Sequence, residues 1–321
     1  MILTKHFEMC TLSIISKQIK GSLFKKTRIS TLQRCITGVS EESKRQNDLF
    51  VAEQKRQKEL IGRIEKIDVS YDGPPENAKL VMNKNLSTPY DCAKHLGSTV
   101  LNKAVVALLN RETLWHMHRP LPDSCTLELL HYHLPNPASV NKTFWRSCGF
   151  ILGAVISDAF KDTVRLNLHS FPSPNVKTGS FVYDVQLSLD DWRPTKQELK
   201  VLSIEMIKFC QQNHPIECLN VEKDIALDIF KSNRTKLSKY PTLQLITVGT
   251  HVDISRGPMI PNTSHLGRTT VTNVIKLDTD IPGDPIYSLL EDRARTLNSG
   301  RIPGSQGTET EDHTFASRVV I

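Results

Sequence analysis

The sequence predicts an α+β protein made of two consecutive units with flexible ends. The chain has 321 residues, about the length of two ordinary domains. Hydrophobic residues make up 39% of it, which is sufficient for packed cores. Runs with the alternation of strands and runs with the caps of helices occur in both units. This mixture of helices and strands is typical of the α+β class.

The first unit, over residues 64–135, has the element order of a small β-grasp domain. Thr88 and Pro89 are typical of a helix N-cap and a first helical residue, and Gly97 is a typical stop. Four runs have the pattern of strands: 64–69, 80–82, 105–109 and 126–130. Two strands, a helix and two strands in about seventy residues fit the β-grasp fold.

The second unit, over residues 138–278, again mixes helices and strands. Thr195 and Glu198 form a capping-box pattern that begins a helix ending near residue 212. Asn220 is expected to cap a short helix that ends near Phe230. The predicted strands are 165–168, 179–187 and 245–252. One apolar run, 140–160, is a predicted helix.

Residues 1–40 have the composition of a mitochondrial transit peptide, with cleavage expected near Arg34. They hold seven of the 41 basic residues and one of the 34 acidic residues. The alternative is a basic tail that binds RNA. The rest of the chain has 34 basic and 33 acidic residues, so it offers no general basic field for phosphate groups. This balance of charge does not exclude local basic patches.

Residues 41–63 predict an exposed, charged helix or linker. Its apolar stripe is sparse, so such a helix more often lies against a partner. Four of its cations are candidate contacts to RNA or protein, with ordinary solvated charges as the alternative: Lys44, Arg45, Lys55 and Arg56. Residues 279–321 mix Pro, Gly, Ser, Thr and acidic residues with little periodicity, and predict a flexible tail.

Several classes of protein are disfavoured by what the sequence lacks. The seven cysteines are scattered and form no Cys-x-x-Cys pair, which argues against a disulfide framework or a zinc finger. No apolar run approaches the roughly 18–20 residues of a membrane helix. There is no phosphate-binding loop, no G-x-G-x-x-G and no H-E-x-x-H. No cofactor, membrane or small-molecule substrate is therefore expected.

Two histidine pairs and one cysteine are weaker candidates for chemistry. His116 with His118, and His131 with His133, would each project from one face if they lay on strands, and four imidazoles can hold zinc. A polar strand face is the preferred interpretation, because no carboxylates or cysteines flank the pairs. Cys148 is a candidate nucleophile, but a buried structural cysteine is favoured.

The order of elements resembles the N-terminal part of threonyl-tRNA synthetases. Residues 64–135 resemble the TGS domain, and 138–278 resemble the editing domain that follows it. Three segments resemble the family patterns F-W-H-S-x-x-H-x-L, G-F-x-Y-D and D-x-C-R-G-P-H-x-P-x-T: Phe144 to Leu152, Gly179 to Asp184, and Asp253 to Thr263. These motifs are specific and occur in the family's order over more than half of the chain.

The departures from these patterns fall on the editing chemistry. The resemblance implies that two histidines on the helix, a cysteine and a third histidine would bind a metal or position water to hydrolyse a mischarged ester. This chain has Arg146, Phe150, Ser255 and Met259 there. Arginine is no base and phenylalanine has no lone pair, so neither replaces an imidazole. Serine is a poor metal ligand, and methionine is too soft and neutral.

The sequence therefore predicts a non-catalytic protein on a degenerate editing scaffold. It also resembles a family of large-subunit proteins specific to mitochondrial ribosomes, in segments that include residues 45–50 and 145–148. That resemblance implies the mitochondrial matrix, large-subunit ribosomal RNA and neighbouring ribosomal proteins. A synthetase would need several hundred further residues, and only an irregular tail is expected after residue 279.

Two alternatives remain at this point, a free-standing Ser-tRNA(Thr) deacylase and a protein that binds tRNA without cleaving it. Arg146 in the former cleft could pair with a phosphate. We expect instead that Phe150 fills the cavity by packing and that Arg146 fills it through a salt bridge.

Overall fold

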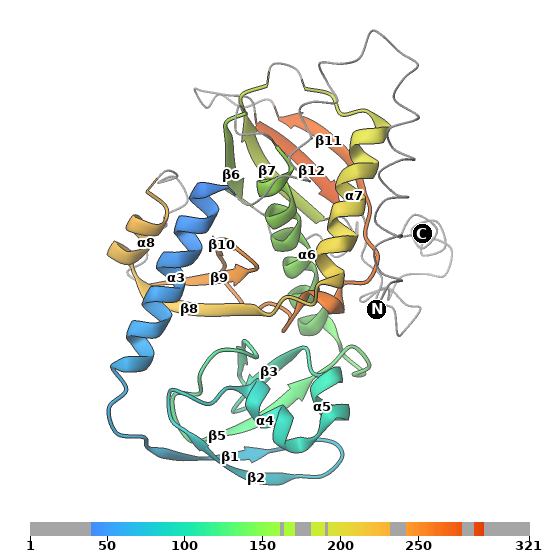
Figure 1. Cartoon of the computed structure of the whole chain (residues 1–321). Coiled ribbons are helices and arrows are strands. Elements are labelled where there is room, and N and C mark those ends of the chain that lie inside the picture. The colour runs from blue at the N-terminus through green and yellow to red at the C-terminus, as the bar shows by residue number, and fades with distance from the viewer. Residues whose placement is uncertain are drawn as a thin grey trace, which may run out of the picture.

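The computed structural model describes residues 40–160, 164–170, 181–189, 192–231, 242–277 and 286–291. The transit peptide predicted over residues 1–40 lies almost wholly outside these ranges. The described chain contains a β-grasp domain, a central unit built around one long helix, and an N-terminal helix that lies along the side of the central unit (Figure 1). None of the helices in these ranges combines the length and apolar character needed to cross a membrane.

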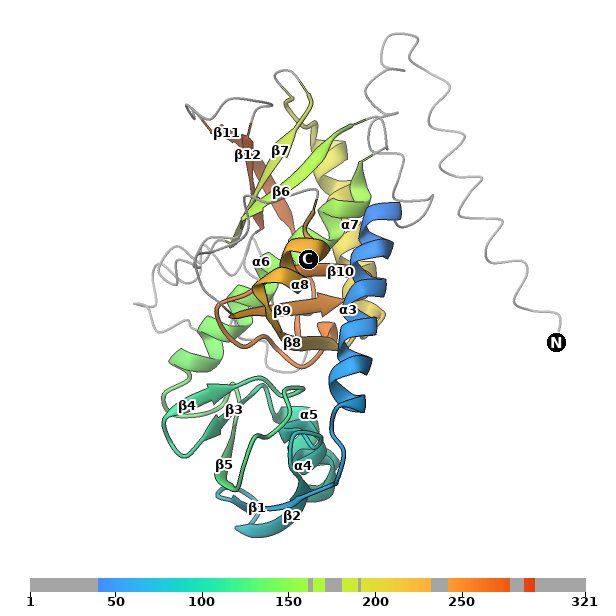
Figure 2. The same cartoon turned by 90° about the vertical axis from the view of Figure 1, so that its left-hand side faces the viewer.

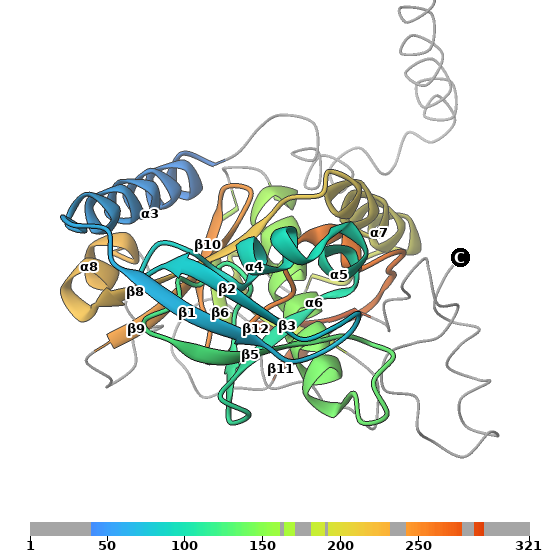
Figure 3. The same cartoon turned by 90° about the horizontal axis from the view of Figure 1, so that it is seen from below.

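The β-grasp domain has one five-stranded sheet with the order β2-β1-β5-β3-β4. Strands β1 and β5 pair in parallel, and the other neighbours are antiparallel. Helices α4 and α5 lie together beside this sheet (Figure 3). The elements are β1 Lys66–Tyr71, β2 Ala78–Asn83, α4 Pro89–Leu96, α5 Ser98–Lys103, β3 Val106–Leu109, β4 Thr113–Trp115 and β5 Cys125–Leu130.

The caps predicted for α4 are confirmed. The Thr88 side chain accepts a hydrogen bond from the backbone N–H of Asp91, and the Asp91 carboxylate accepts one from the backbone N–H of Thr88. Gly97 ends the helix with a φ of 115°. Helix α5 and strand β4 were not predicted, because neither has a side-chain cap or a run of alternating residues long enough to be recognised.

The central unit surrounds α6, which is 22 residues long and buried along most of its length. A four-stranded sheet with the order β11-β12-β7-β6 and a three-stranded sheet with the order β10-β9-β8 pack around it. The elements are α6 Ala138–Ala159, β6 Leu166–Ser170, β7 Phe181–Leu187, α7 Lys196–Gln211, β8 Ile216–Glu222, α8 Lys223–Ile229, β9 Thr242–Val248, β10 His251–Ile254, the 3-10 helix Thr263–His265, β11 Val271–Leu277 and β12 Ile286–Glu291.

The three-stranded sheet separates two clusters of buried side chains. Ile216 on β8 and Ile246 on β9 belong to the large core around α6. Leu219 and Leu245, on the same strands, pack instead with Phe50 of α3 (Glu41–Glu59). The long blue helix α3 therefore covers the face of the sheet opposite α6, as Figure 2 shows. The helix predicted here is found, and it packs on its own chain; a contact with another molecule stays a prediction.

Several predicted boundaries are wrong. Asn220 caps no helix, because it lies in β8, where Leu219 and Val221 are buried; α8 begins after Glu222. The strand predicted over 245–252 is a hairpin of β9 and β10, since Gly249 turns the chain with a φ of 59°.

The flexible tail predicted over 279–321 contains a strand. Residues Ile286–Glu291 form β12, which pairs antiparallel with both β11 and β7. The prediction is therefore wrong for these residues, because they join a sheet between the neighbouring strand β11 and the strand β7, which lies about a hundred residues earlier. The remainder of that segment lies outside the described residues.

Candidate functional site

The four former editing positions lie in the middle of α6 and on the turn that follows β10. Arg146 and Phe150 are four residues apart on α6, so they lie on one face of the helix. Ser255 and Met259 belong to the turn. The turn is fastened to the helix by Ser147, whose Oγ accepts a hydrogen bond from the backbone N–H of Ile260 at 2.9 Å.

Three of the four positions are filled with buried side chains. Phe150 and Met259 have no exposed surface, and Ser255 is 5% exposed. The Phe150 ring lies 5.3 Å, centroid to centroid, from the His251 ring. The Met259 sulfur lies 3.5 Å from Ser147 Oγ. The packing expected for Phe150 agrees with its complete burial.

Ser255 closes the turn rather than facing a ligand. Its Oγ donates a hydrogen bond to the carbonyl oxygen of Gly257 at 3.0 Å and accepts one from the Gly257 N–H at 3.3 Å. The hydroxyl is therefore engaged on both sides. It is held where the family pattern has a thiol, and it maintains the local backbone.

Arg146 differs from the other three positions. Its Nη1 donates to the carbonyl oxygen of Pro258 at 3.0 Å, and Gly257 leaves the space that the guanidinium occupies, since a Cβ there would lie 2.5 Å from Nη1. Burial lowers the pKa of Arg146. No carboxylate of the described residues pairs with it, so the salt bridge expected for Arg146 is not found, and that expectation is wrong.

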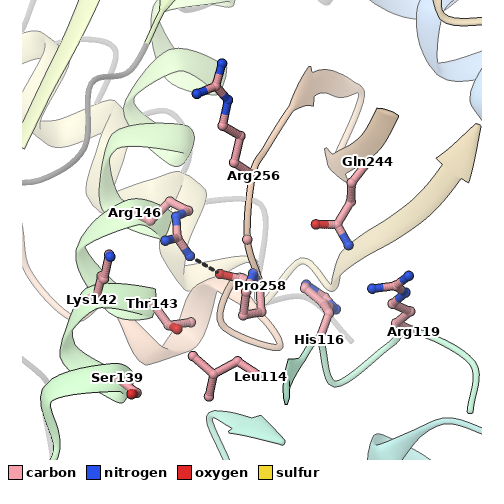
Figure 4. A pocket seen from close by; sticks show the side chains of 11 residues that line it. Leu114, His116, Arg119, Ser139, Lys142, Thr143, Arg146, Gln244, Arg256 and Pro258 are labelled. Carbon is pink, nitrogen blue, oxygen red and sulfur yellow. Dashed lines mark hydrogen bonds between the residues drawn. The ribbon is translucent and has the colours of Figure 1, made fainter. Parts of the chain in front are cut away.

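A cavity of ≈ 320 Å³ lies beside Arg146, between the end of α6, the turn after β10 and the β-grasp domain (Figure 4). The former editing cleft is thus filled at Phe150, Ser255 and Met259, here called its inner side. It is open beside Arg146, here called its outer side. Its lining is Leu114, His116, Arg119, Ser139, Lys142, Thr143, Arg146, Gln244, Arg256, Gly257 and Pro258.

Behind the filled positions lies one buried polar pair. The Tyr183 hydroxyl donates to Asp253 Oδ2 at 2.5 Å, and both side chains are buried. Burial, together with the nearby Asp253 carboxylate, raises the pKa of Tyr183 well above its ordinary value. This pair joins β7 to β10 across the core. It gives the cleft a rigid wall but supplies neither an accessible base nor a metal ligand.

The four substituted positions cannot carry out the editing reaction. They contain no imidazole, thiolate or carboxylate, so they can neither hold a metal ion nor remove a proton from water at neutral pH. Elsewhere in the described ranges, no group of three His, Cys, Asp or Glu side chains is arranged to hold a metal. Cys148 lies on α6 and is fully buried in the hydrophobic core around that helix.

Comparison with known proteins agrees with this combination of a retained frame and altered chemistry. The chain is 40% identical over 301 residues to the large ribosomal subunit protein mL39 of Drosophila melanogaster, covering 86% of this chain and 90% of that protein. It belongs to the mL39 family. Residues 76–131 also match the family model of the TGS domain.

Synthetases are similar over a shorter region than the mL39 relative. A probable cytoplasmic threonine–tRNA ligase of Dictyostelium discoideum is 32% identical over 204 residues, 62% of this chain. The threonine–tRNA ligase of Thermotoga maritima is 30% identical over 183 residues, 55% of this chain. The chain spans 27% and 26% of the lengths of these two ligases.

The histidine pairs considered as zinc ligands in this mL39-family chain do not lie on strands. His116 and His118 follow the end of β4, and His131 and His133 follow the end of β5. Within each pair, one ring accepts a hydrogen bond from the backbone N–H of the other residue. The condition on which the zinc interpretation depended is therefore not met.

The candidate cations of α3 have different surroundings. Arg45 donates to Glu42 and to the carbonyl oxygens of Asp228 and Ile229, so it fastens α3 to α8. Arg56 pairs with Glu53 at 2.7 Å. Lys55 is 76% exposed and lies 3.7 Å from Glu59. Lys44 is exposed and has no ion pair among the described residues.

Sequence reasoning missed the residues that the β-grasp domain contributes to the cavity. His116 and Arg119 follow β4, and only the packing of that domain against α6 brings them near Arg146. The sequence held one local indication for Arg119, namely its spacing from an aromatic residue. Arg119 is four residues after Trp115, and its guanidinium stacks on the indole at 3.7 Å.

Proposed function

We propose that this chain is a structural component of the mitochondrial large ribosomal subunit and supports mitochondrial translation without catalysing a reaction. One observation carries the proposal, the 40% identity to an mL39 protein across 90% of that protein's length. The basic, nearly acid-free residues 1–40 support import into the mitochondrial matrix.

The filled cleft supports a structural role over hydrolysis. Phe150 and Met259 are completely buried where the family pattern has histidines, and the Ser255 hydroxyl is bonded within its own turn. A protein that hydrolysed charged tRNA would need an accessible base or metal at these positions. The chain is therefore not an enzyme, although it resembles enzymes over more than half of its length.

Large-subunit ribosomal RNA and neighbouring ribosomal proteins are the proposed partners. Of the four candidate cations on α3, Lys44, Lys55 and Arg56 are exposed, with Arg56 paired with Glu53, whereas Arg45 is engaged with α8. The same helix and the segment after it expose apolar side chains suited to protein neighbours: Val51 at 51%, Leu60 at 69% and Ile64 at 56%. We retain Lys44 and Lys55 as candidate RNA contacts.

Sedimentation of mitochondrial lysate through a density gradient tests the proposal. We expect the tagged chain to move with the large-subunit ribosomal RNA, and to stay with that RNA when lowered magnesium separates the large from the small subunit. Recovery only in light fractions that lack ribosomal RNA would contradict the proposal.

Paired variants sharpen the test. Replacing both Lys44 and Lys55 by glutamine is expected to lower the recovery with the subunit, most clearly at raised salt, because phosphate contacts weaken with ionic strength. The control replaces Lys208, which is exposed on α7 and paired with Glu205, and should sediment like the unchanged chain.

A further inference from the structure

We propose that the cavity beside Arg146 is an anion site that binds a phosphate group of a nucleotide or of RNA. It is lined by four basic side chains and one histidine, and by no carboxylate. The basic side chains are Arg119, Lys142, Arg146 and Arg256. In Figure 4, Arg256 extends away from the others, while Arg146 and Lys142 approach from α6 and Arg119 from the β-grasp domain.

The first argument is that buried positive charge is left without a carboxylate. Arg146 is partly buried, and its described hydrogen bond is to the neutral carbonyl oxygen of Pro258. Arg119 is also partly buried and has no carboxylate partner in the described chain. Burying unpaired charge is unfavourable, so such cations are usually paired with an anion. An anion in the cavity would lie beside both guanidinium groups.

The second argument is independent and concerns His116. Its side chain is 1% exposed, and its Nδ1 accepts the backbone N–H of His118 at 3.1 Å. A neutral imidazole that accepts at Nδ1 carries its proton at Nε2. Nε2 has no hydrogen-bond partner in the described structure, although it is buried. A buried donor that lines a cavity and lacks an acceptor indicates a ligand that supplies one.

The groups that line the cavity are also held in place. The Arg119 guanidinium stacks on the Trp115 ring at 3.7 Å, while the indole N–H donates to the Arg119 carbonyl oxygen at 3.1 Å. His118 Nε2 lies 2.9 Å from the carbonyl oxygen of Pro261, which ties the His116 loop to the turn after β10. A preorganised set of donors loses little entropy when an anion binds.

The chemistry of the donors favours phosphate. A guanidinium group offers a planar fork that matches phosphate oxygens, and three separate cations suit a group that carries up to two negative charges. The cavity volume of ≈ 320 Å³ is at the lower end of small-molecule sites, which are roughly 300–1,000 Å³. A free nucleotide and the backbone of RNA both present such a phosphate.

Calorimetric titration of the purified full chain tests this inference with three probes: inorganic phosphate, AMP, and a six-nucleotide RNA with hydroxyl ends. At least one probe should bind, and Arg146→Gln should weaken it by about tenfold or more, as expected for loss of a charge-assisted hydrogen bond. Lys142→Gln, at the exposed rim of the cavity, should weaken it less. Stronger binding of AMP would identify a nucleotide site, and stronger binding of the RNA a backbone site.

The matched control is Lys79→Gln, which removes one charge from an exposed lysine on strand β2. It should change the affinity by less than about twofold, since ordinary surface charges act weakly. Arg146→Lys keeps the charge and should bind more tightly than Arg146→Gln, which separates recognition from any fault in folding.

Three results would overturn the inference. They are binding of none of the probes, equal losses in Arg146→Gln and Lys79→Gln, and equally tight binding of a hexaglutamate peptide. None of them depends on whether the chain sediments with a ribosomal subunit, so failure here is distinguishable from failure of the structural role.

Discussion

The inner and outer sides of the former editing cleft have been changed in different ways. On the inner side, Phe150 and Met259 fill space and are completely buried. On the outer side, Arg146 reaches a cavity that also receives Arg119 and His116 from the β-grasp domain. The inner substitutions add apolar packing, whereas the outer one adds a partly buried positive charge.

This difference separates two consequences of losing catalysis. Where a catalytic imidazole is replaced by a phenyl ring, the polar pocket becomes part of the hydrophobic core, and stability is expected to depend on it. Where it is replaced by an arginine without a carboxylate partner, stability is expected to gain little, and the position stays available for an anion. The predictions that follow contrast these two sides.

The largest effect is expected for Phe150→Ala. Removing a fully buried phenyl ring leaves a cavity in the core and should lower the free energy of unfolding by about 3–5 kcal/mol. Urea denaturation followed by circular dichroism measures it. Arg146→Ala is the matched change on the outer side, and it should lower the free energy by less than about 1 kcal/mol. Similar losses for the two variants would remove the distinction between the two sides.

Gly153→Ala should also be strongly destabilising. A Cβ at Gly153 of α6 would lie 2.3 Å from Cε2 of Tyr183, whose ring is fixed by burial and by its hydrogen bond to Asp253. Overpacking of this kind costs about 1–3 kcal/mol, and it should outweigh the roughly 1 kcal/mol by which alanine is the better helix former. An unchanged or raised melting temperature would show that the core around α6 can rearrange to accommodate the added methyl group.

The structure explains which parts of the fold were predictable from the sequence. Helix caps are local, and the reciprocal hydrogen bonds of Thr195 and Glu198 are those that the sequence pattern predicts. Strand β12 depends only in part on a local partner, since it pairs with the neighbouring β11 and also with β7, about a hundred residues earlier in the chain. Its six residues were therefore assigned to a tail. Asn220 was mistaken for a cap because its own type favours caps, although Leu219 and Val221 are buried beside it in β8.

The candidate site was predictable in its positions but not in its shape. The motif alone identified Arg146 and Phe150, because they replace residues at a fixed spacing on one helix. The motif could not show that one side chain packs into the core and the other lines a cavity. That outcome depends on His116 and Arg119, which another domain brings to the site.

Acid should weaken the fold through histidines whose pKa is lower in the folded chain than in the unfolded chain. Burial lowers the pKa of His265 from 6.5 to about 4 and that of His116 well below 6.5. Between pH 6.5 and 4 the unfolded chain therefore binds protons that these folded residues do not. Stability should be complete above pH 6.5 and fall as the pH drops, at up to about 1.4 kcal/mol per pH unit for each histidine.

Urea midpoints measured from pH 7.5 to 4.5 check this dependence. His265→Gln should have a shallower slope than the unchanged chain, because one of the histidines with a lowered pKa is removed. His95→Gln replaces a histidine on α4 that does not line the cavity beside Arg146, and it serves as the control. A slope unaffected by His265→Gln would contradict the assignment to that residue.

The smallest change in stability is expected for Gly257→Ala on the outer side. The new Cβ would lie 2.5 Å from Arg146 Nη1, the far end of a flexible side chain that can move aside. The free energy of unfolding should change by less than about 1 kcal/mol, while the hydrogen bond from Arg146 to Pro258 is lost. Thermal unfolding alongside Gly153→Ala compares the two glycines, and a large loss at Gly257 would show that the outer side is as tightly packed as the inner one.

Deacylation of Ser-tRNA(Thr) by the purified chain tests the central claim most directly, namely that this cleft has kept its frame and lost its chemistry. We expect release of serine at the rate measured in buffer alone, with or without added zinc, because Arg146, Phe150, Ser255 and Met259 offer neither a base nor a metal ligand. A multiple-turnover deacylation activity that copurifies with the chain and disappears in Asp253→Asn would contradict the account.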